Sequence, residues 1–237
     1  MGSTVASLQT DYLAIEMIKV GYLLPWNKDK NAKRSTYEGG KNFHWNGRFT
    51  DVYGLDVQAM YPNNAVNCNI SPETFKSFEP SEEMTYEYDE PQHSRTETEI
   101  WAYLKDDKLK ILGSVVVDTN EGVLIKIIKY FMHLKDTTDK HLFKGKRDGY
   151  KLIINTFYGL LGNGGGWMNS TLFAALITYQ AGVVLRNSME FIRQTLSISN
   201  EVDPICFGNT DSVFTSLVNV KGYDSTKSIH ENHDFLK

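Results

Sequence analysis

The stretch Phe207-Gly208-Asn209-Thr210-Asp211-Ser212 decides the fold that we expect for the C-terminal part of the chain. Apolar residues lead into it at 205–207 and out of it at 213–214, so the pattern predicts a β-hairpin with a polar tip. Asn and Asp favour turns for local hydrogen-bonding reasons, and an acid at such a tip is ordinarily turn chemistry. Asp211 therefore becomes a functional candidate only together with other parts of the chain.

A second aspartate stands in the stretch Asp56-Val57-Gln58-Ala59-Met60-Tyr61-Pro62. Residues 49–60 alternate towards a strand that ends at Asp56. Two aspartates delivered by neighbouring strands would supply the carboxylate oxygens that Mg²⁺ prefers. A pair of divalent metals can drive an in-line attack on a phosphate. The sequence therefore predicts a site for two Mg²⁺ ions, with Mn²⁺ as a substitute, at Asp56 and Asp211.

A third stretch, Lys151-Leu152-Ile153-Ile154-Asn155-Thr156-Phe157-Tyr158-Gly159, carries polar residues on one helix stripe. Lys151, Asn155 and Tyr158 follow one another at helical spacing. Apolar residues cover the other sides, so we expect a largely buried helix whose polar stripe needs a partner. An incoming triphosphate is such a partner, with Lys151 as a compact positive charge. Arg147, one turn earlier, is a second candidate.

These three stretches, in this order, resemble motifs A, B and C of the family B DNA polymerases. The stretch Tyr37-Glu38-Gly39-Gly40 is similar to a Tyr-x-Gly-Gly element that the family carries shortly before motif A. The stretch Asn69-Ile70-Ser71-Pro72-Glu73-Thr74, after motif A, is also similar to such polymerases. The resemblance covers roughly residues 37–215.

The resemblance implies template-directed DNA synthesis, in which deoxynucleotides pass from dNTPs to a primer 3′-hydroxyl by two-metal catalysis. It assigns catalysis to Asp56, Asp211 and Lys151 and the two Mg²⁺ ions to the aspartates. It assigns nucleotide binding to Tyr61, Lys151, Asn155, Tyr158 and Arg147, with Tyr61 leaving no room for a 2′-hydroxyl. It assigns contacts with primer-template DNA to Tyr37, Gly39, Gly40, Gly159 and Thr210.

The implied fold class is α+β: a polymerase palm with an antiparallel sheet backed by helices, plus a fingers subdomain formed by a helical hairpin. We expect an N-terminal helix and template-side loop over residues 1–48 and a first part of the palm over 49–121. Fingers would follow over 122–161 and a second part of the palm over 162–237. Individual helices are predicted at 12–24, 122–135, 147–161 and 170–196, and strands within 49–60, 100–117 and 204–215. Residues 25–48 are expected as a loop and residues 76–99 as a surface loop or ribbon.

Asn209 stands where the family usually has the first aspartate of motif C. An amide can contact a metal but brings no charge, so we expect the metal site to rest on Asp56 and Asp211. No exonuclease segment is visible, and the stretch after Ser212 is too short for a thumb. We therefore expect a minimal, split or truncated core, with a second polymerase subunit or another partner supplying the thumb.

Two other interpretations remain open. The first is a catalytically weakened or silent palm that serves as a DNA-binding subunit of a replication complex, which Asn209 and the missing thumb favour. The second, a reverse transcriptase, is less favoured, because its motif C places two aspartates side by side.

The composition is that of an ordinary globular protein, with 41% hydrophobic and 23% charged residues. The net charge is −4, but residues 126–151 are rich in Lys and Arg, and such a stretch can follow phosphates. Cys68 and Cys206 form no metal-spaced pair, which favours a reduced interior. No stretch predicts a membrane span. We expect a protein of the cytoplasm, or of the host-cell cytoplasm if the source is a virus.

Overall fold

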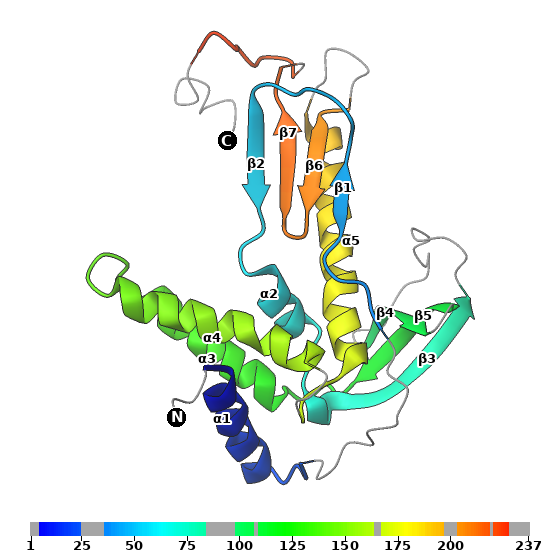
Figure 1. Ribbon diagram of the computed structural model, residues 1–237, viewed down its shortest axis with the longest axis vertical. Coiled ribbons are helices and arrows are strands. Elements are labelled where there is room, and N and C mark those ends of the chain that lie inside the picture. The colour runs from blue at the N-terminus through cyan, green and yellow to red at the C-terminus, as the bar shows by residue number, and fades with distance from the viewer. Residues whose placement is uncertain are drawn as a thin grey trace. The chain divides into compact units, whose positions relative to one another are not determined.

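The computed structural model describes residues 5–24, 36–83, 98–106, 109–163, 167–196, 203–218 and 220–227. Two compact units divide the chain. The first unit comprises Met1–Gly39 and Tyr61–Gln180, and the second comprises Gly40–Met60 and Ala181–Lys237. Each unit combines helices with one antiparallel sheet (Figure 1). The expected mixture of helices and antiparallel strands is confirmed.

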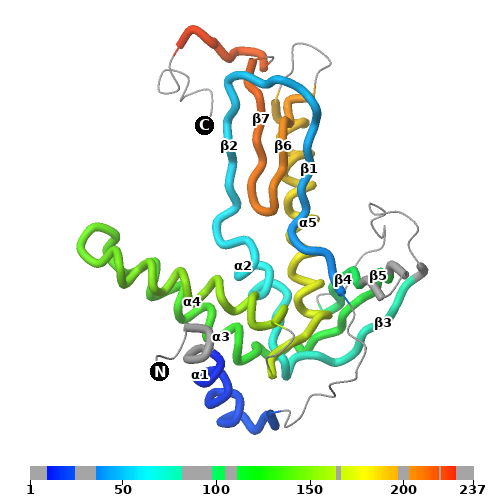
Figure 2. The backbone as a smooth tube through the Cα atoms, in the orientation of Figure 1, coloured from blue at the N-terminus to red at the C-terminus, as the bar shows by residue number. Residues whose placement is uncertain are grey.

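The second unit is built on a four-stranded sheet in the order β1-β6-β7-β2 (Figure 2). Its strands are β1 (Asn42–His44), β2 (Val52–Asp56), β6 (Ile205–Asn209) and β7 (Ser212–Ser216). Helix α5 (Thr171–Thr195), from Ala181 onwards, covers one face of this sheet. There Leu185 and Met189 form a buried cluster with Ile205 and Val213. The apolar strands on either side of the 207–212 stretch thus form the predicted hairpin.

The register of this sheet brings the end of β2 beside the hairpin turn. Asp56 pairs with Ser212, and Asn209 also pairs with Ser212, so Thr210 and Asp211 form a two-residue turn. The predicted strand that ends at Asp56 is confirmed. Strand β1, by contrast, lies within residues 25–48, which are expected from the sequence as a loop. Its three residues are too few to show an alternation of apolar and polar side chains.

The first unit holds a three-stranded sheet in the order β3-β5-β4. Its strands are β3 (Phe75–Glu83), β4 (Glu99–Asp106) and β5 (Leu109–Val117). The two strands predicted within 100–117 are confirmed. Strand β3 occupies the start of the segment expected as a loop or ribbon, and residues 84–97 lie outside the described residues. An edge strand with charges and Pro80 lacks the aliphatic pattern by which sequence reasoning finds strands.

Helices of the first unit share one core with this sheet. They are α1 (Val5–Lys19), α2 (Met60–Asn67, from Tyr61 onwards), α3 (Val123–Thr137), α4 (Lys144–Gly162) and the start of α5. Their apolar faces share one core that includes Leu124, Ile128, Ile154 and Leu161. Helices α3 and α4 form the predicted helical hairpin. Helix α1 begins earlier than expected and ends at Lys19, before Gly21 at a φ of +82°. Helix α2 was not predicted.

The stretch 69–74 fixes the start of α3. The sequence 67–74 predicts a turn followed by a helix start, with Ser71 as N-cap and Pro72 at the first helical position. The structure has Ser71 as the N-cap and Pro72 at the start, but the helix is only a 3₁₀ turn, η1 (Pro72–Thr74). Side chains of residues 69–74 accept backbone N–H groups at the start of α3. Asn69 Oδ1 accepts the N–H of Gly122 at 2.9 Å, and Glu73 Oε1 accepts the N–H of Val123 at 2.5 Å. Ser71 Oγ accepts from Leu124 at 3.1 Å. These bonds satisfy N–H groups that a helix start leaves unpaired.

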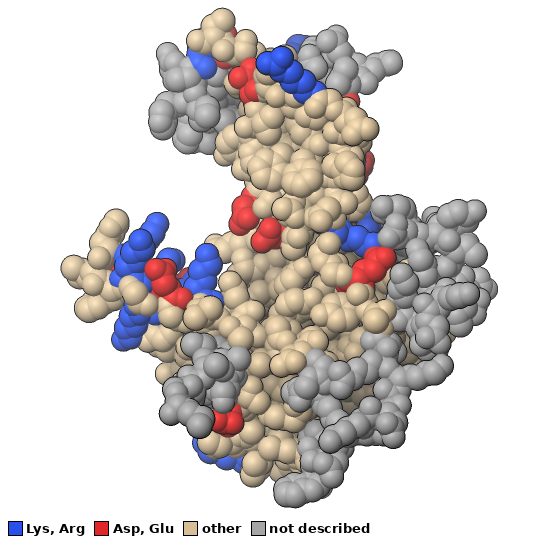
Figure 3. Space-filling view, viewed as in Figure 1, with Lys and Arg blue, Asp and Glu red and all other residues tan. Residues whose placement is uncertain are grey.

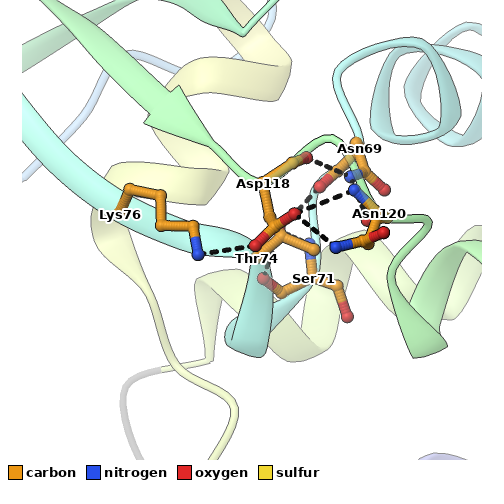
Figure 4. A network of polar contacts seen from close by, with 6 residues as sticks. All are labelled: Asn69, Ser71, Thr74, Lys76, Asp118 and Asn120. Carbon is orange, nitrogen blue, oxygen red and sulfur yellow. Dashed lines mark hydrogen bonds and ion pairs between the residues drawn. The ribbon is translucent and has the colours of Figure 1, made fainter.

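A second layer of polar contacts holds this capping segment in place (Figure 4). Asn69 Nδ2 donates to the backbone oxygens of Asp118 and Asn120, at 2.7 and 2.8 Å. Lys76 forms an ion pair with Asp118 at 2.5 Å, and this pair is the main reason that the pKa of Asp118 lies below its usual range. The segment 69–74 thus anchors the α3–α4 hairpin to the sheet of the same unit.

Candidate active site

A serine hydroxyl connects the two predicted aspartates in the second unit. Ser212 Oγ lies 3.1 Å from Asp56 Oδ2 and 3.2 Å from Asp211 Oδ1. The hydroxyl has one proton, so it donates to one carboxylate at a time. The backbone N–H of Val57 donates to Asp211 O at 2.8 Å, which ties the end of β2 to the turn. The structure thus brings Asp56 and Asp211 together.

The chemistry of this carboxylate pair fits a hard divalent cation. Asp56 is exposed and Asp211 is half-buried, so a cation and its waters can reach both. Within the described ranges, no group of three or more His, Cys, Asp or Glu residues is arranged to hold a metal. Mg²⁺ is commonly held by one or two protein carboxylates together with water and substrate phosphates. A cation would also offset the repulsion between two adjacent carboxylates.

The turn itself is shaped by its backbone. Thr210 has a φ of +54°, in the left-handed region, and its N–H donates to Lys41 O at 2.8 Å. Thr210 Oγ1 donates to Asn209 Oδ1 at 3.1 Å, and Asn209 is exposed. Gly40, next to Lys41, is exposed as well. The predicted DNA contacts Thr210 and Gly40 therefore belong to the same unit as the carboxylate pair.

A tyrosine cluster brings three predicted positions together in the first unit. The rings of Tyr61 and Tyr158 lie 4.5 Å apart between centroids, at 55°. Tyr158 Oη donates to Tyr37 Oη at 3.3 Å. All three side chains are half-buried, and burial, followed by the hydrogen bond to Tyr37, raises the pKa of Tyr158 well above its usual range. The phenol therefore keeps its proton at neutral pH and can act as a donor.

Two residues that sequence reasoning missed hold Tyr37 in this cluster. A Cβ at Gly162 would lie 2.5 Å from Tyr37 Oη, so a larger residue at this position would displace the end of the tyrosine side chain. Thr178 Oγ1 lies 2.8 Å from Glu38 O and can donate to it, which fastens the Tyr37 segment to α5. Contacts between segments so far apart leave no local signal in the sequence.

Two of the three residues of the polar stripe of α4 face solvent, whereas the third, Tyr158, is half-buried. Lys151, Asn155 and Gly159 are exposed, and no ion pair of Lys151 occurs among the described residues. The expectation that apolar residues would bury the rest of the helix was wrong at Leu152, which is 52% exposed. Arg147 is half-buried, and its Nε donates to Lys135 O at 3.2 Å.

The predicted glycines leave open space around the backbone. Apart from the adjacent backbone, no described atom lies within 4 Å of where a Cβ would stand at Gly39 or Gly159. Such positions permit close approach of another molecule, although exposed glycines need not have that role. Tyr37, Gly39, Tyr61 and the α4 residues belong to the first unit, whereas Gly40, Asp56 and the hairpin turn belong to the second.

Comparison with known proteins identifies the family. The model of DNA polymerase family B matches residues 8–234, so the chain belongs to this family. A DNA polymerase of Paramecium bursaria Chlorella virus NY2A is 22% identical over 220 residues, covering 84% of this chain and 22% of the viral protein. A DNA polymerase of Archaeoglobus fulgidus is 23% identical over 232 residues, covering 96% of this chain and 27% of the archaeal protein.

A solved structure shows the same fold. The family B DNA polymerase from the hyperthermophilic archaeon Pyrobaculum calidifontis superposes with a TM-score of 0.52 at 18% identity, covering 98% of this chain and 28% of that one. The chain thus spans between 22% and 28% of the length of these relatives. Among the described residues, no helix is both long and apolar enough to cross a membrane.

Proposed function

We propose that this chain carries the catalytic core of a DNA polymerase and transfers deoxynucleotides from dNTPs to a primer 3′-hydroxyl under the direction of a template. The observation that carries the proposal is the position of Asp56 and Asp211, both within hydrogen-bond distance of Ser212 Oγ, in a chain of this family. We name the second unit's sheet and the helix behind it as part of a palm, and the α3–α4 hairpin as fingers.

Asp56 and Asp211 are the residues that would hold two Mg²⁺ ions, or Mn²⁺ in their place. When bound, these ions supply charge neutralisation at the triphosphate, the 3′-oxygen and the leaving pyrophosphate. Ser212 Oγ lies within hydrogen-bond distance of both carboxylates and orients one of them at a time, and a group that orients metal ligands is commonly needed for affinity. Asn209 adds no charge, so the site relies on two carboxylates.

The first unit supplies the nucleotide contacts in this proposal. Lys151 is an exposed cation that neutralises the triphosphate, with Asn155 and Arg147 on the same helix as further contacts. Tyr61 lies under the deoxyribose and excludes a 2′-hydroxyl, and Tyr158 holds its ring from the side. Primer-template DNA is contacted through Tyr37, Gly39, Gly40, Gly159 and Thr210. A second subunit or the remainder of a longer polymerase grips the duplex.

Catalytic silence is the second candidate function. One residue favours it: Asn209 takes a position where an acid is usual in the family, and its amide oxygen already accepts a hydrogen bond from Thr210 Oγ1. In that case the chain holds primed DNA within a replication complex without extending it.

Primer extension separates the two candidates. Purified chain is incubated with primed template, dNTPs and Mg²⁺ or Mn²⁺, beside Asp211→Asn and a charge-matched control, Asp11→Asn, at an exposed position on α1. The polymerase proposal expects extension by the wild type and the control, more extension by Asn209→Asp, and none by Asp211→Asn. Binding of primed DNA without extension by either the wild type or Asn209→Asp, in the presence of its replication partners, would contradict it and support the silent subunit.

A further inference from the structure

The connection between α3 and α4 exposes apolar side chains among cations. We call this part the tip surface and define it by Lys140, His141, Leu142, Phe143, Lys144 and Lys146. All six residues are exposed. Leu142 is 76% exposed and Phe143 57% exposed, and large apolar side chains left in water at this level lose the benefit of burial. Figure 3 shows Lys and Arg side chains gathered over the α3–α4 hairpin.

Hydrogen bonds hold the backbone of the tip surface in a defined turn. Asp139 Oδ1 accepts the backbone N–H groups of His141 and Leu142, both at 2.8 Å. The N–H of Phe143 donates to Asp139 O at 3.1 Å, and Thr138 Oγ1 donates to Leu134 O at 2.6 Å. These bonds fix the backbone on which Leu142 and Phe143 stand. Their exposure is therefore a property of the ordered turn.

The cations of the tip surface are available to a partner. No ion pair of Lys140, Lys144 or Lys146 occurs within the described part of the chain. Lys146 Nζ lies 5.9 Å from the centre of the Tyr150 ring, a contact that leaves its charge uncompensated. The acid nearest to them in the turn, Asp139, is engaged by backbone N–H groups, which lower its pKa.

We propose that the tip surface binds single-stranded nucleic acid, with a base on the Phe143 ring and phosphates at Lys140, Lys144 and Lys146. Sites that bind single strands without sequence preference combine cations, which contact the phosphates, with aromatic rings, on which the bases stack. A duplex does not offer its base faces to such a ring, since they are stacked inside. The identification of this strand as the unpaired template rests on the proposed function, whereas the binding itself does not.

Fluorescence anisotropy with a labelled fifteen-nucleotide oligo(dT) tests the proposal on the full chain. The assay contains neither divalent metal nor dNTP and is repeated on Asp211→Asn, so that it stands apart from any failure of DNA synthesis. Phe143→Ala should weaken binding roughly 5- to 160-fold, the range that corresponds to loss of one base stack. Lys144→Gln with Lys146→Gln should lower the slope of log K against log salt by about 1.4, since each phosphate contact on a single strand contributes about 0.7.

Two control variants remove the same kinds of side chain, a ring and two cations, outside the tip surface. Phe191 on α5 is 67% exposed, so Phe191→Ala removes an equally accessible ring elsewhere. Arg48→Gln with Lys221→Gln removes two exposed cations outside the tip surface and outside the basic stretch 126–151. Both controls should bind oligo(dT) as the wild type does, and all variants should keep the wild-type melting temperature, because the altered side chains are exposed.

Three outcomes would overturn the proposal. The first is wild-type affinity in Phe143→Ala. The second is equal affinity for a blunt duplex of the same length with the same loss on Phe143→Ala. The third is stronger binding of the tip surface to vesicles of anionic phospholipid, or to an acidic peptide of equal charge, than to oligo(dT).

Discussion

Replacement of Gly122 by alanine should destabilise the first unit, although the backbone conformation of this residue suits any amino acid. Gly122 precedes α3 with φ −67° and ψ 155°, so no conformational strain arises. The added Cβ, however, would stand closer to Ser71 Cβ than two carbon atoms can approach, and 2.9 Å from Thr74 Cγ2. Both neighbours are buried, and Ser71 Oγ is bonded to the N–H of Leu124. The effect is therefore steric.

The size of this effect follows from two contributions. Overpacking at a buried site costs about 1–3 kcal/mol. A displaced Ser71 also weakens the cap of α3, and loss of a cap costs about 1 kcal/mol. We expect the free energy of unfolding to fall by about 2–4 kcal/mol. Gly149→Ala is the matched control: it lies within α4 with no atom within 4 Å of its Cβ position, and should stabilise the helix by about 0.5–1 kcal/mol.

Thermal unfolding and hydrogen exchange measure the two variants together. For a chain of this size, each kcal/mol corresponds to roughly 2–4 °C in melting temperature. A chain with two compact units can unfold in more than one step, so the exchange rates of the Val123 and Leu124 amides report on the cap itself. Equal melting temperatures for the two variants, with unchanged protection of these amides, would refute the reasoning.

Three further predictions concern the site. Ser212→Ala should weaken Mn²⁺ binding about tenfold, because loss of a group that orients metal ligands lowers metal affinity by this order. The control Ser216→Ala, on the same strand, should leave Mn²⁺ affinity unchanged. Equal affinities of the two variants, titrated by electron paramagnetic resonance, would contradict this prediction. Tyr61→Ala should raise ribonucleotide incorporation, and unchanged sugar selection would exclude a role under the deoxyribose. Lys151→Ala should lower kcat/KM for dNTP about 10- to 100-fold, the cost of a charged contact. The control Lys221→Ala, at an exposed lysine outside the basic stretch 126–151, should leave kcat/KM unchanged, and similar values for both variants would argue against a triphosphate contact.

Local patterns predicted the elements that carry the aspartates. The alternation before Asp56 and the apolar residues around 207–212 are properties of single strands, so they can be recognised without the partner strand. The same holds for α3, α4 and α5, which are long and periodic. Strands β1 and β3 lacked such patterns, the first because it is short and the second because it is a polar edge.

Contacts between distant segments could not be predicted. Tyr37 and Tyr158 are 121 positions apart, and no local feature indicates that their hydroxyls meet. Glu73 lies in the first turn of η1, yet its carboxylate also caps α3, fifty positions later. Leu152 was expected to be buried because it is apolar, yet it lies beside Lys151 on the exposed side of α4. Burial depends on which helix face the neighbouring elements leave uncovered.

Iron-directed cleavage would locate a divalent metal in this chain. In this method Fe²⁺ takes the place of Mg²⁺ at a divalent-metal site, and hydroxyl radicals formed there with ascorbate and peroxide cut the nearby backbone. We expect cuts next to Asp56 and within residues 210–212, which excess Mg²⁺ suppresses and Asp211→Asn abolishes, while Asp11→Asn keeps them. Cuts confined to other segments, or an unchanged pattern in Asp211→Asn, would contradict a divalent-metal site at Asp56 and Asp211.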